Sequence, residues 1–255
     1  MTLLVIDIGN TNVVLGTYQG KELTAHWRIS TDHNRMPDEY GMMILSLLKH
    51  GGQDPATINS ICIGSVVPPL TSWFDEMCRR YFGAAPLIVS AGVKTGVRIR
   101  LDNPREAGAD RIANAAACFR KYGGPACIVD IGTATTFDAI SAEGDYLGGA
   151  IAPGPRGAAE ALFLRAARLP RIDLVRPAKA IGSNTVEAMQ SGVLLGYVGL
   201  VEGLVARFKK ELGPAMRVIG TGGLVELIAA ESSVIEILDP WLTLDGLRII
   251  WEMNQ

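Results

Sequence analysis

One short motif occurs twice in this 255-residue chain, and the repetition constrains the fold more than any other feature. The string DIGNTN begins at Asp7 and the string DIGTAT begins at Asp130, about half the chain later. Each string follows a short apolar strand and precedes another. Because two separate hairpin turns have no structural need to resemble each other, the repeat predicts two related halves, each offering one hairpin to a shared cleft.

Both copies have the composition of a phosphate-binding turn. An aspartate at a strand end can hold a hydrated Mg²⁺, a glycine lets the backbone approach a polyphosphate closely, and turn amides and hydroxyls donate hydrogen bonds. Either copy alone could be an ordinary hairpin, because Asn and Gly are favoured in such turns. The repetition favours phosphate binding. The residues concerned are Asp7, Gly9, Asn10, Thr11 and Asn12 in the first copy, and Asp130, Gly132, Thr133, Thr135 and Thr136 in the second.

Strands and helices alternate along the chain, which predicts an α/β fold. A Pro- and Arg-containing stretch, residues 168–180, is predicted to be irregular. The helices expected from apolar periodicity and from Pro and Gly signals cover residues 38–50, 68–82, 112–122, 158–167, 185–212, 224–230 and 242–252.

The long helix predicted at residues 185–212 carries two distinct stripes. The apolar stripe, which we expect to face the core, contains Val186, Met189, Val193, Tyr197, Leu200, Leu204 and Phe208. The other stripe contains Gly192, Gly196, Gly199 and Gly203. Since each glycine costs about 1 kcal/mol relative to Ala in a helix, four on one face indicate a close backbone approach. Two alternatives remain open: packing on the protein's own sheet, or a helix–helix contact across a dimer.

A glycine-rich turn, IGTGG, lies late in the chain. Gly220, Gly222 and Gly223 connect a predicted strand at residues 217–219 to a predicted helix that begins at Leu224. A glycine-rich strand-to-helix turn suits close approach by a nucleotide, although such turns also contain glycine for packing reasons. Its position in the second half favours a nucleotide contact.

Composition excludes several other classes. The net charge of −2 and the aromatic content of 6% argue against binding to nucleic acid or to an anionic membrane. The four cysteines lie in apolar contexts without metal-ligand spacing, which is typical of a reducing compartment. No signal peptide is visible, and the longest apolar stretch, residues 193–205, is interrupted by Glu202 and predicts no membrane span. A cytoplasmic location is expected.

With these motifs, the sequence resembles a known family, the type III pantothenate kinases, over nearly the whole chain. The family belongs to the actin, hexokinase and Hsp70-like superfamily. The resemblance therefore implies two duplicated ribonuclease H-like (actin-like ATPase) domains with a cleft between them, at residues 1–115 and 116–255. The motifs that carry it are DIGNTN at 7–12, NPREAGADR at 103–111, DIGTATT at 130–136, GGAIAPG at 148–154, NTVEAMQSG at 184–192, IGTGG at 219–223 and DPWLTLDGL at 239–247.

The resemblance implies ATP-dependent phosphorylation of pantothenate, the first step of coenzyme A biosynthesis. Asp110 matches the family's catalytic base, which takes the proton of the pantothenate hydroxyl. Gly108 and Arg111 match substrate-binding neighbours, and Arg111 would meet the pantothenate carboxylate. Leu101 is a departure, because many relatives have Tyr at this position near the substrate.

The resemblance also implies the cofactors and the assembly. Asp7 and its turn would face the phosphates of ATP and a Mg²⁺ ion, and Asp130 matches the residue that binds a monovalent cation, K⁺ or NH₄⁺. Thr185 matches a residue that reaches the substrate from the neighbouring subunit, which implies a homodimer.

Two alternative functions use the same fold: a non-catalytic regulator, as some relatives are described as accessory factors, and a kinase for another small alcohol. Without the resemblance, Asp110 could be a first-turn acid favoured by the helix dipole, and Arg111 a surface ion-pair partner. The intact aspartates argue against a regulator, and no DNA-binding signature accompanies them.

Overall fold

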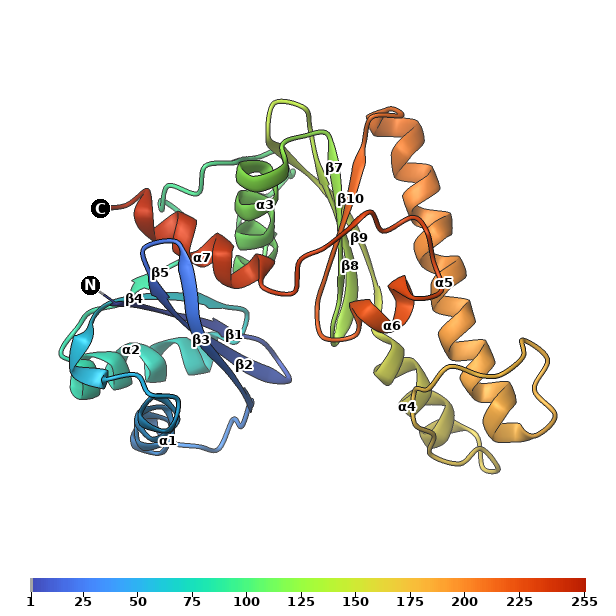
Figure 1. Ribbon diagram of the computed structural model, residues 1–255, viewed down its shortest axis with the longest axis horizontal. Coiled ribbons are helices and arrows are strands. Elements are labelled where there is room, and N and C mark those ends of the chain that lie inside the picture. The colour runs from blue at the N-terminus through green and yellow to red at the C-terminus, as the bar shows by residue number, and fades with distance from the viewer. Residues whose placement is uncertain (1) are drawn as a thin grey trace. The chain divides into compact units, whose positions relative to one another are not determined.

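The computed structural model describes residues 2–255, which form two compact units. The first unit contains the chain up to Arg98 together with Asp102–Ala117 and Leu242–Gln255. The second unit contains Ile99–Leu101 and Cys118–Trp241. Each unit is built around one β-sheet with helices packed against it (Figure 1).

The sheet of the first unit has the strand order β3-β2-β1-β4-β5. Its central strand β1 pairs antiparallel with β2 and parallel with β4, and Leu4 and Ile6 of β1 are fully buried against α1 and α2. The elements of this unit are β1 (Thr2–Ile8), β2 (Asn12–Gln19), β3 (Glu22–Ser30), α1 (Pro37–His50), β4 (Ile58–Ser65), α2 (Pro68–Phe82), β5 (Leu87–Ile88) and α7 (Leu242–Glu252), with α3 (Ala109–Tyr122) beginning here.

The sheet of the second unit has the order β11-β10-β7-β8-β9-β6. Helix α5 lies along this sheet, with α4 beside its N-terminal part (Figure 1). Cys127, Val129 and Ile131 of β7 form one core with apolar residues of α5. The elements are β6 (Arg98–Ile99), β7 (Ala126–Ile131), β8 (Ala134–Ile140), β9 (Asp145–Pro153), α4 (Pro155–Arg165), α5 (Thr185–Leu212), β10 (Arg217–Thr221), α6 (Val225–Ala229) and β11 (Ile237–Leu238).

The two sheets share one topology, apart from the additional edge strand β6 of the second sheet. In each, a three-stranded antiparallel meander (β1-β2-β3 or β7-β8-β9) continues on its other side through two parallel strands, β4-β5 or β10-β11. Asp7 and Asp130 are each the penultimate residue of the central strand. The predicted duplicated α/β fold is therefore confirmed.

Helix α5 decides between the two explanations of the glycine stripe. Gly192, Gly196 and Gly199 are exposed, and a Cβ atom placed on any of them would meet no atom within 4 Å. Packing on the protein's own sheet is therefore wrong, and the contact across a dimer remains. The apolar stripe packs into the core as expected, except that Val186 is 40% exposed.

By length and composition, α5 could also cross a membrane, contrary to the expectation from the sequence, and it is the one such helix within residues 2–255. Its apolar residues Val193, Leu194 and Val201 are buried in the core of the second unit, as in a core helix.

The units differ from the predicted division at residues 115 and 116. The first unit extends to Ala117 within α3, and it also includes α7. Helix α7 packs on the first sheet because two of its leucines fill space left by two strand glycines. A methyl carbon of Leu244 would lie 2.9 Å from a Cβ atom placed on Gly16, and a methyl carbon of Leu247 would lie 2.8 Å from one placed on Gly64.

Candidate active site

The first motif forms the turn between β1 and β2. Asp7 is half-buried near the end of β1, and strand alternation directs its side chain to the sheet face that α7 covers. The amide of Gly9 donates to the carbonyl of Asn12 at 3.0 Å, which closes the turn. Asn10 and Thr11 are exposed at its tip.

The second predicted feature of the first unit, Gly108–Arg111, starts helix α3. The carbonyl of Gly108 accepts the amide of Ile112 at 3.0 Å, and the amide of Arg111 donates to Oδ1 of Asp110 at 2.8 Å. A Cβ atom on Gly108 would collide with the Asp110 carboxylate, so glycine is needed here for this orientation. Arg111 is half-buried beside it.

Asp7 and the start of α3 lie at the same edge of the first unit. In the sheet, Asp7 pairs with Gly64 of β4, and a Cβ placed on Gly64 would lie 3.7 Å from the Cβ of Ala109. The side chain of Val66, two residues further along, would lie 3.3 Å from a Cβ on Gly108. The structure thus brings together two predicted groups that are about 100 residues apart in the sequence.

The environment of Asp110 favours proton uptake. Burial raises the pKa of Asp110 above its usual range, because it disfavours the charged carboxylate. The amide hydrogen bond and the positive charge of Arg111 oppose this shift without cancelling it. A carboxylate with a raised pKa is a stronger base and can accept a proton from an attacking hydroxyl group.

The second motif forms the turn between β7 and β8, and it is one residue shorter than the first. Ile131 pairs with Thr135 across this turn, whereas Ile8 pairs with Val13 across the first. Asp130 therefore occupies the same strand position as its counterpart, but the residues that follow do not correspond one to one.

Two further glycines enclose this second turn. Gly222 has φ +92°, and a Cβ there would collide with Oδ1 of Asp130 and with the backbone of Ile131. Gly154 donates its amide to the carbonyl of Thr133 at 3.0 Å, and a Cβ there would collide with the turn backbone. These two glycines therefore let other segments of the chain pack closely against the carboxylate of Asp130 and the carbonyl groups of the turn.

The three threonines of the second motif lie in different environments. Thr133 is exposed in the turn, and Thr136 lies opposite Asp130 on the same face of the sheet. Thr135 is fully buried on the other face, as is Phe137, which contacts Phe208 of α5 with ring centroids 6.2 Å apart. Oγ1 of Thr135 has no hydrogen-bond partner among residues 2–255. The alternation directs Thr135 away from Asp130, so Thr133 and Thr136 are better placed for a phosphate.

The glycines of the third motif also divide into two kinds. Gly220 is buried in β10, and a Cβ there would lie 2.7 Å from side-chain atoms of Val225 and Ile235, which is a packing constraint. Gly223 is exposed and precedes α6. Gly223 is thus the exposed glycine of this turn, whereas Gly220 and Gly222 each pack closely against other residues of the chain.

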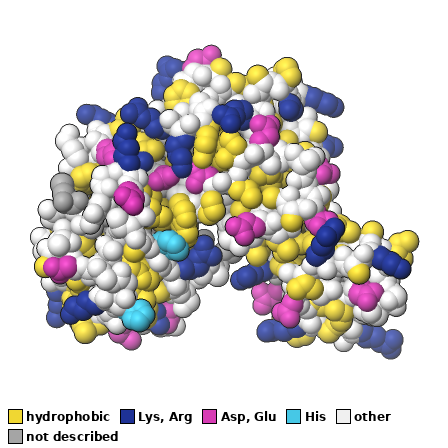
Figure 2. Space-filling model, in the orientation of Figure 1, with side chains coloured by type: hydrophobic (Ala, Val, Ile, Leu, Met, Phe, Trp, Pro, Cys, Tyr) yellow, Lys and Arg dark blue, Asp and Glu magenta, His cyan; other side chains and the backbone are white. Residues whose placement is uncertain are grey.

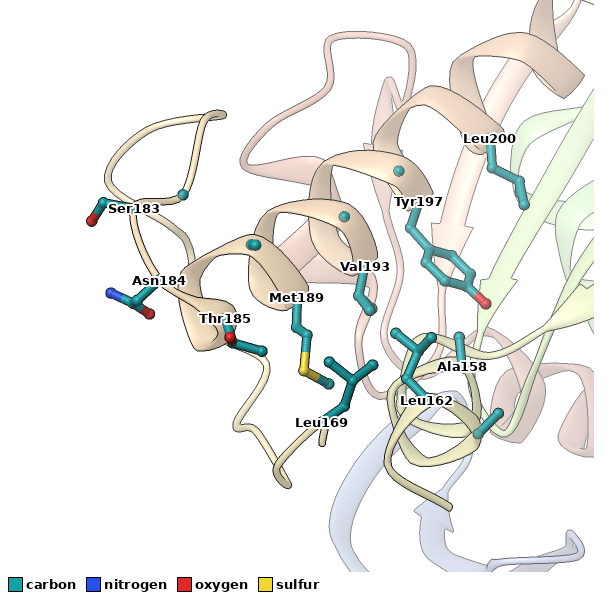
Figure 3. Close-up of a pocket in the computed structure, with 15 residues that line it drawn as sticks. Ala158, Leu162, Leu169, Ser183, Asn184, Thr185, Met189, Val193, Tyr197 and Leu200 are labelled. Atoms are coloured by element: carbon teal, nitrogen blue, oxygen red, sulfur yellow. The ribbon is translucent and has the colours of Figure 1, made fainter. Parts of the chain in front are cut away.

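The remaining predicted substrate contacts, Leu101 and Thr185, belong to the second unit. Leu101 is half-buried, with its Cδ2 3.0 Å from a Cβ placed on Gly148 of β9. Thr185 is the first residue of α5 and is exposed at one end of an apolar groove of about 970 Å³. Figure 3 shows Met189, Val193 and Tyr197 of α5 along this groove, with Leu162 of α4 beside them.

Two residues in these turns have roles that sequence reasoning missed. Thr31 Oγ1 donates to the carbonyl of Gly9 at 2.6 Å and so holds the first turn from the end of β3; no sequence signal indicated it. Gly154 lies in the motif GGAIAPG, but the motif did not reveal its contact with the second turn.

Substitution of Gly222 tests the close approach at Asp130. We expect Gly222→Ala to lower activity at least tenfold, because the new methyl group displaces the Asp130 carboxylate. The matched control is Gly92→Ala: Gly92 has a similar φ of +96° but no atom within 4 Å of its Cβ position, so it carries the backbone strain alone. Equal activity of the two variants, measured at matched folded fractions, would contradict this role of Gly222.

The chemistry of the donors limits how a metal could bind. No group of three or more His, Cys, Asp or Glu side chains forms a metal site within residues 2–255. A Mg²⁺ ion near Asp7 would therefore take most of its ligands from phosphates and water, as Mg²⁺ at nucleotide sites usually does. Asp7 fits this arrangement because it offers one half-buried carboxylate at a turn.

The fold and these turns define a class of protein, the actin-like ATPase fold, which includes sugar kinases. A glucomannokinase of Arthrobacter that uses polyphosphate or ATP matches with a TM-score of 0.51, 12% identity, and coverage of 100% of this chain and 99% of that chain. A protein of Campylobacter jejuni described as a Baf family transcriptional activator matches with a TM-score of 0.62, 21% identity, and 98% coverage of both chains. At these identities the likeness concerns the fold alone.

Sequence comparison identifies the family within this class. The model of the type III pantothenate kinase family matches residues 3–207. The type III pantothenate kinase of Roseiflexus castenholzii is 56% identical over 253 residues, which cover 99% of both proteins. The chain belongs to the type III pantothenate kinase family, a family of phosphotransferases.

Proposed function

We propose that this protein transfers the γ-phosphoryl group of ATP to the hydroxyl group of pantothenate, giving 4′-phosphopantothenate in the first step of coenzyme A biosynthesis. The observation that carries the proposal is the nearly full-length match to members of the family. The motifs of this chain that resemble the family contain Asp7, Asp110 and Asp130. Mass spectrometry of the product formed from ATP and pantothenate tests it. A phosphorylated product from another alcohol in a substrate panel, with none from pantothenate, would overturn it.

Asp110 acts as the general base in this proposal. Phosphoryl transfer needs positioning, charge neutralisation and a group that takes the hydroxyl proton. The raised pKa of Asp110 and its fixed orientation beside Gly108 support this role. Gly108 and Arg111 bind the substrate next to it, with the Arg111 guanidinium facing the pantothenate carboxylate.

ATP is bound through the two turns. The first turn, Gly9–Asn12, contacts the phosphates, with Asp7 holding Mg²⁺ through water. The second turn contributes Gly132, Thr133 and Thr136, and the backbone at Gly222 and Gly223 approaches the adenosine. Thr135 and Gly220 support these segments by packing, as their burial indicates.

Asp130 binds the monovalent cation, K⁺ or NH₄⁺. Its carboxylate and the carbonyl of Ile131 both face the position of Gly222, and the carbonyl of Thr133 faces Gly154. Such carbonyl and carboxylate oxygens can replace the hydration shell of K⁺ or accept hydrogen bonds from NH₄⁺.

The protein acts as a homodimer in which α5 contacts its partner. Gly192, Gly196 and Gly199 of this helix support this, since exposed helix glycines with no neighbouring atom near the Cβ position leave room for another backbone. Thr185, at the start of the same helix, would then reach the site of the neighbouring subunit, close to Leu101 and the substrate.

The surface of the protein agrees with a small-molecule substrate rather than nucleic acid, and the proposed location is the cytoplasm. On the face in Figure 2, Lys and Arg side chains of the described residues are interspersed with Asp and Glu. The net charge of −2 adds no general attraction for nucleic acid.

A further inference from the structure

The segment DPWLTLDGL at residues 239–247 lies beyond the residues 3–207 that the family model matches, and none of its residues belongs to the site described above. Its last residues begin α7, which packs between the sheet of the first unit and helix α3. This helix therefore connects the strand that carries Asp7 to the helix that carries Asp110.

On the side that faces the sheet, two leucines of α7 pack against strand glycines and so set the distance between the helix and the sheet. Leu244 contacts the position of Gly16 in β2, and Leu247 contacts the position of Gly64 in β4. Gly64 pairs with Asp7 in the sheet, so this contact lies directly beside the first turn.

On the other side, α7 contacts α3 backbone to backbone. A Cβ on Gly246 would collide with the carbonyl group of Ala113, so only glycine permits this approach. Oγ1 of Thr243 donates to Oδ1 of Asn114 at 2.8 Å, and Asn114 is fully buried.

These contacts lie one helical turn from Asp110. Ala113 and Asn114 follow it by three and four residues, which places all three on the same face of α3. The contacts of α7 therefore help to fix the position of Asp110 relative to Asp7, together with the direct contacts of the start of α3 at Gly64 and Val66.

We propose that Gly246 and the hydrogen bond between Thr243 and Asn114 position Asp110 for proton transfer, a role that rests on Asp110 being the general base of the proposed function. They are positioning residues, because they reach the substrate only through α3. A displacement of about 1 Å at a reacting group can cost about 100-fold in rate, so a small shift of α3 is sufficient for a large effect.

Substitutions of Thr243 in the full-length protein test this inference. Thr243→Val keeps the shape but removes the hydroxyl donor, and we expect it to lower kcat about tenfold while the KM for Mg-ATP stays within about twofold. Thr243→Ser restores the donor and should return kcat to within about twofold of wild type. Gly246→Ala, where it folds, should lower kcat in the same selective way.

The control is Leu48→Ala, which opens a cavity under α1 on the opposite face of the same sheet. It should lower the thermal stability without lowering kcat below that of wild type. Equal kcat for Thr243→Val and wild type, or a loss that Thr243→Ser does not rescue, would overturn the positioning role. An inactive wild-type protein would instead contradict the proposed function.

Discussion

Replacement of Asp110 by Asn is expected to lower kcat by a factor of about 10² to 10⁴, the usual contribution of a general base. The Asn side chain has the same shape and its Oδ1 can still accept the amide of Arg111, the hydrogen bond that measures 2.8 Å in the wild type. Affinity for ATP should therefore change little. Steady-state kinetics together with nucleotide binding by calorimetry measure both effects.

The variant should also be at least as stable as wild type at pH 7. Burial raises the pKa of Asp110 in the folded state, so the stability that the protonated form contributes is lost as the pH rises through that pKa. Asn carries no charge and avoids this loss. Because the pKa of Asp110 is raised, the kcat of the wild type should fall at low pH as Asp110 becomes protonated, with an apparent pKa above that of an ordinary aspartate. The pH–rate profile of Asp110→Asn should lack this decrease at low pH.

Asp75→Asn is the matched control, because Asp75 is a surface carboxylate of α2, 3.1 Å from Arg79. It should leave kcat and its decrease at low pH unchanged. Full activity of Asp110→Asn would remove Asp110 as the base, and a variant that fails to fold would contradict the stability argument.

Gly196→Leu is expected to convert the proposed homodimer to a monomer and to lower kcat at least tenfold if Thr185 of the partner completes the site. The chain itself should tolerate the change, because no atom lies within 4 Å of a Cβ at this position. Replacement of a helical glycine should even stabilise the folded chain by several tenths of a kcal/mol to about 1 kcal/mol. Sedimentation velocity and activity on the same samples measure the outcome.

Ser46→Leu adds a similar apolar group to an exposed position of α1 and serves as the control. It should leave both the oligomeric state and the activity unchanged. A dimeric and fully active Gly196→Leu variant would exclude the glycine stripe as the dimer contact.

Much of the fold could be predicted because it depends on local patterns. The repeated motif and the alternation of apolar strands and helices predict the duplication, and Pro, Gly and apolar spacing predict the helices to within a few residues. The assignment of α7 to the first unit could not be predicted, because it depends on Leu244 and Leu247 meeting Gly16 and Gly64. These contacts pair residues near the C-terminus with residues in the first third of the chain, and no local sequence pattern indicates such a pairing.

The candidate site was predictable in its residue types but less so in their orientation. Strand alternation could have indicated that Thr135 faces away from Asp130, because the two positions fall on opposite faces once the turn length is known. That length differs from the first turn, so the similarity of the two strings concealed it. The proximity of Asp7 and Gly108–Arg111 depends on β4 and α7 and required the structure.

The most direct test of the central claim is a coupled assay of ADP release by the purified protein with Mg-ATP. We expect turnover that requires pantothenate and either K⁺ or NH₄⁺, and that disappears when either the pantothenate or the cation is omitted. ATP binding without any pantothenate-dependent ADP release would contradict the account.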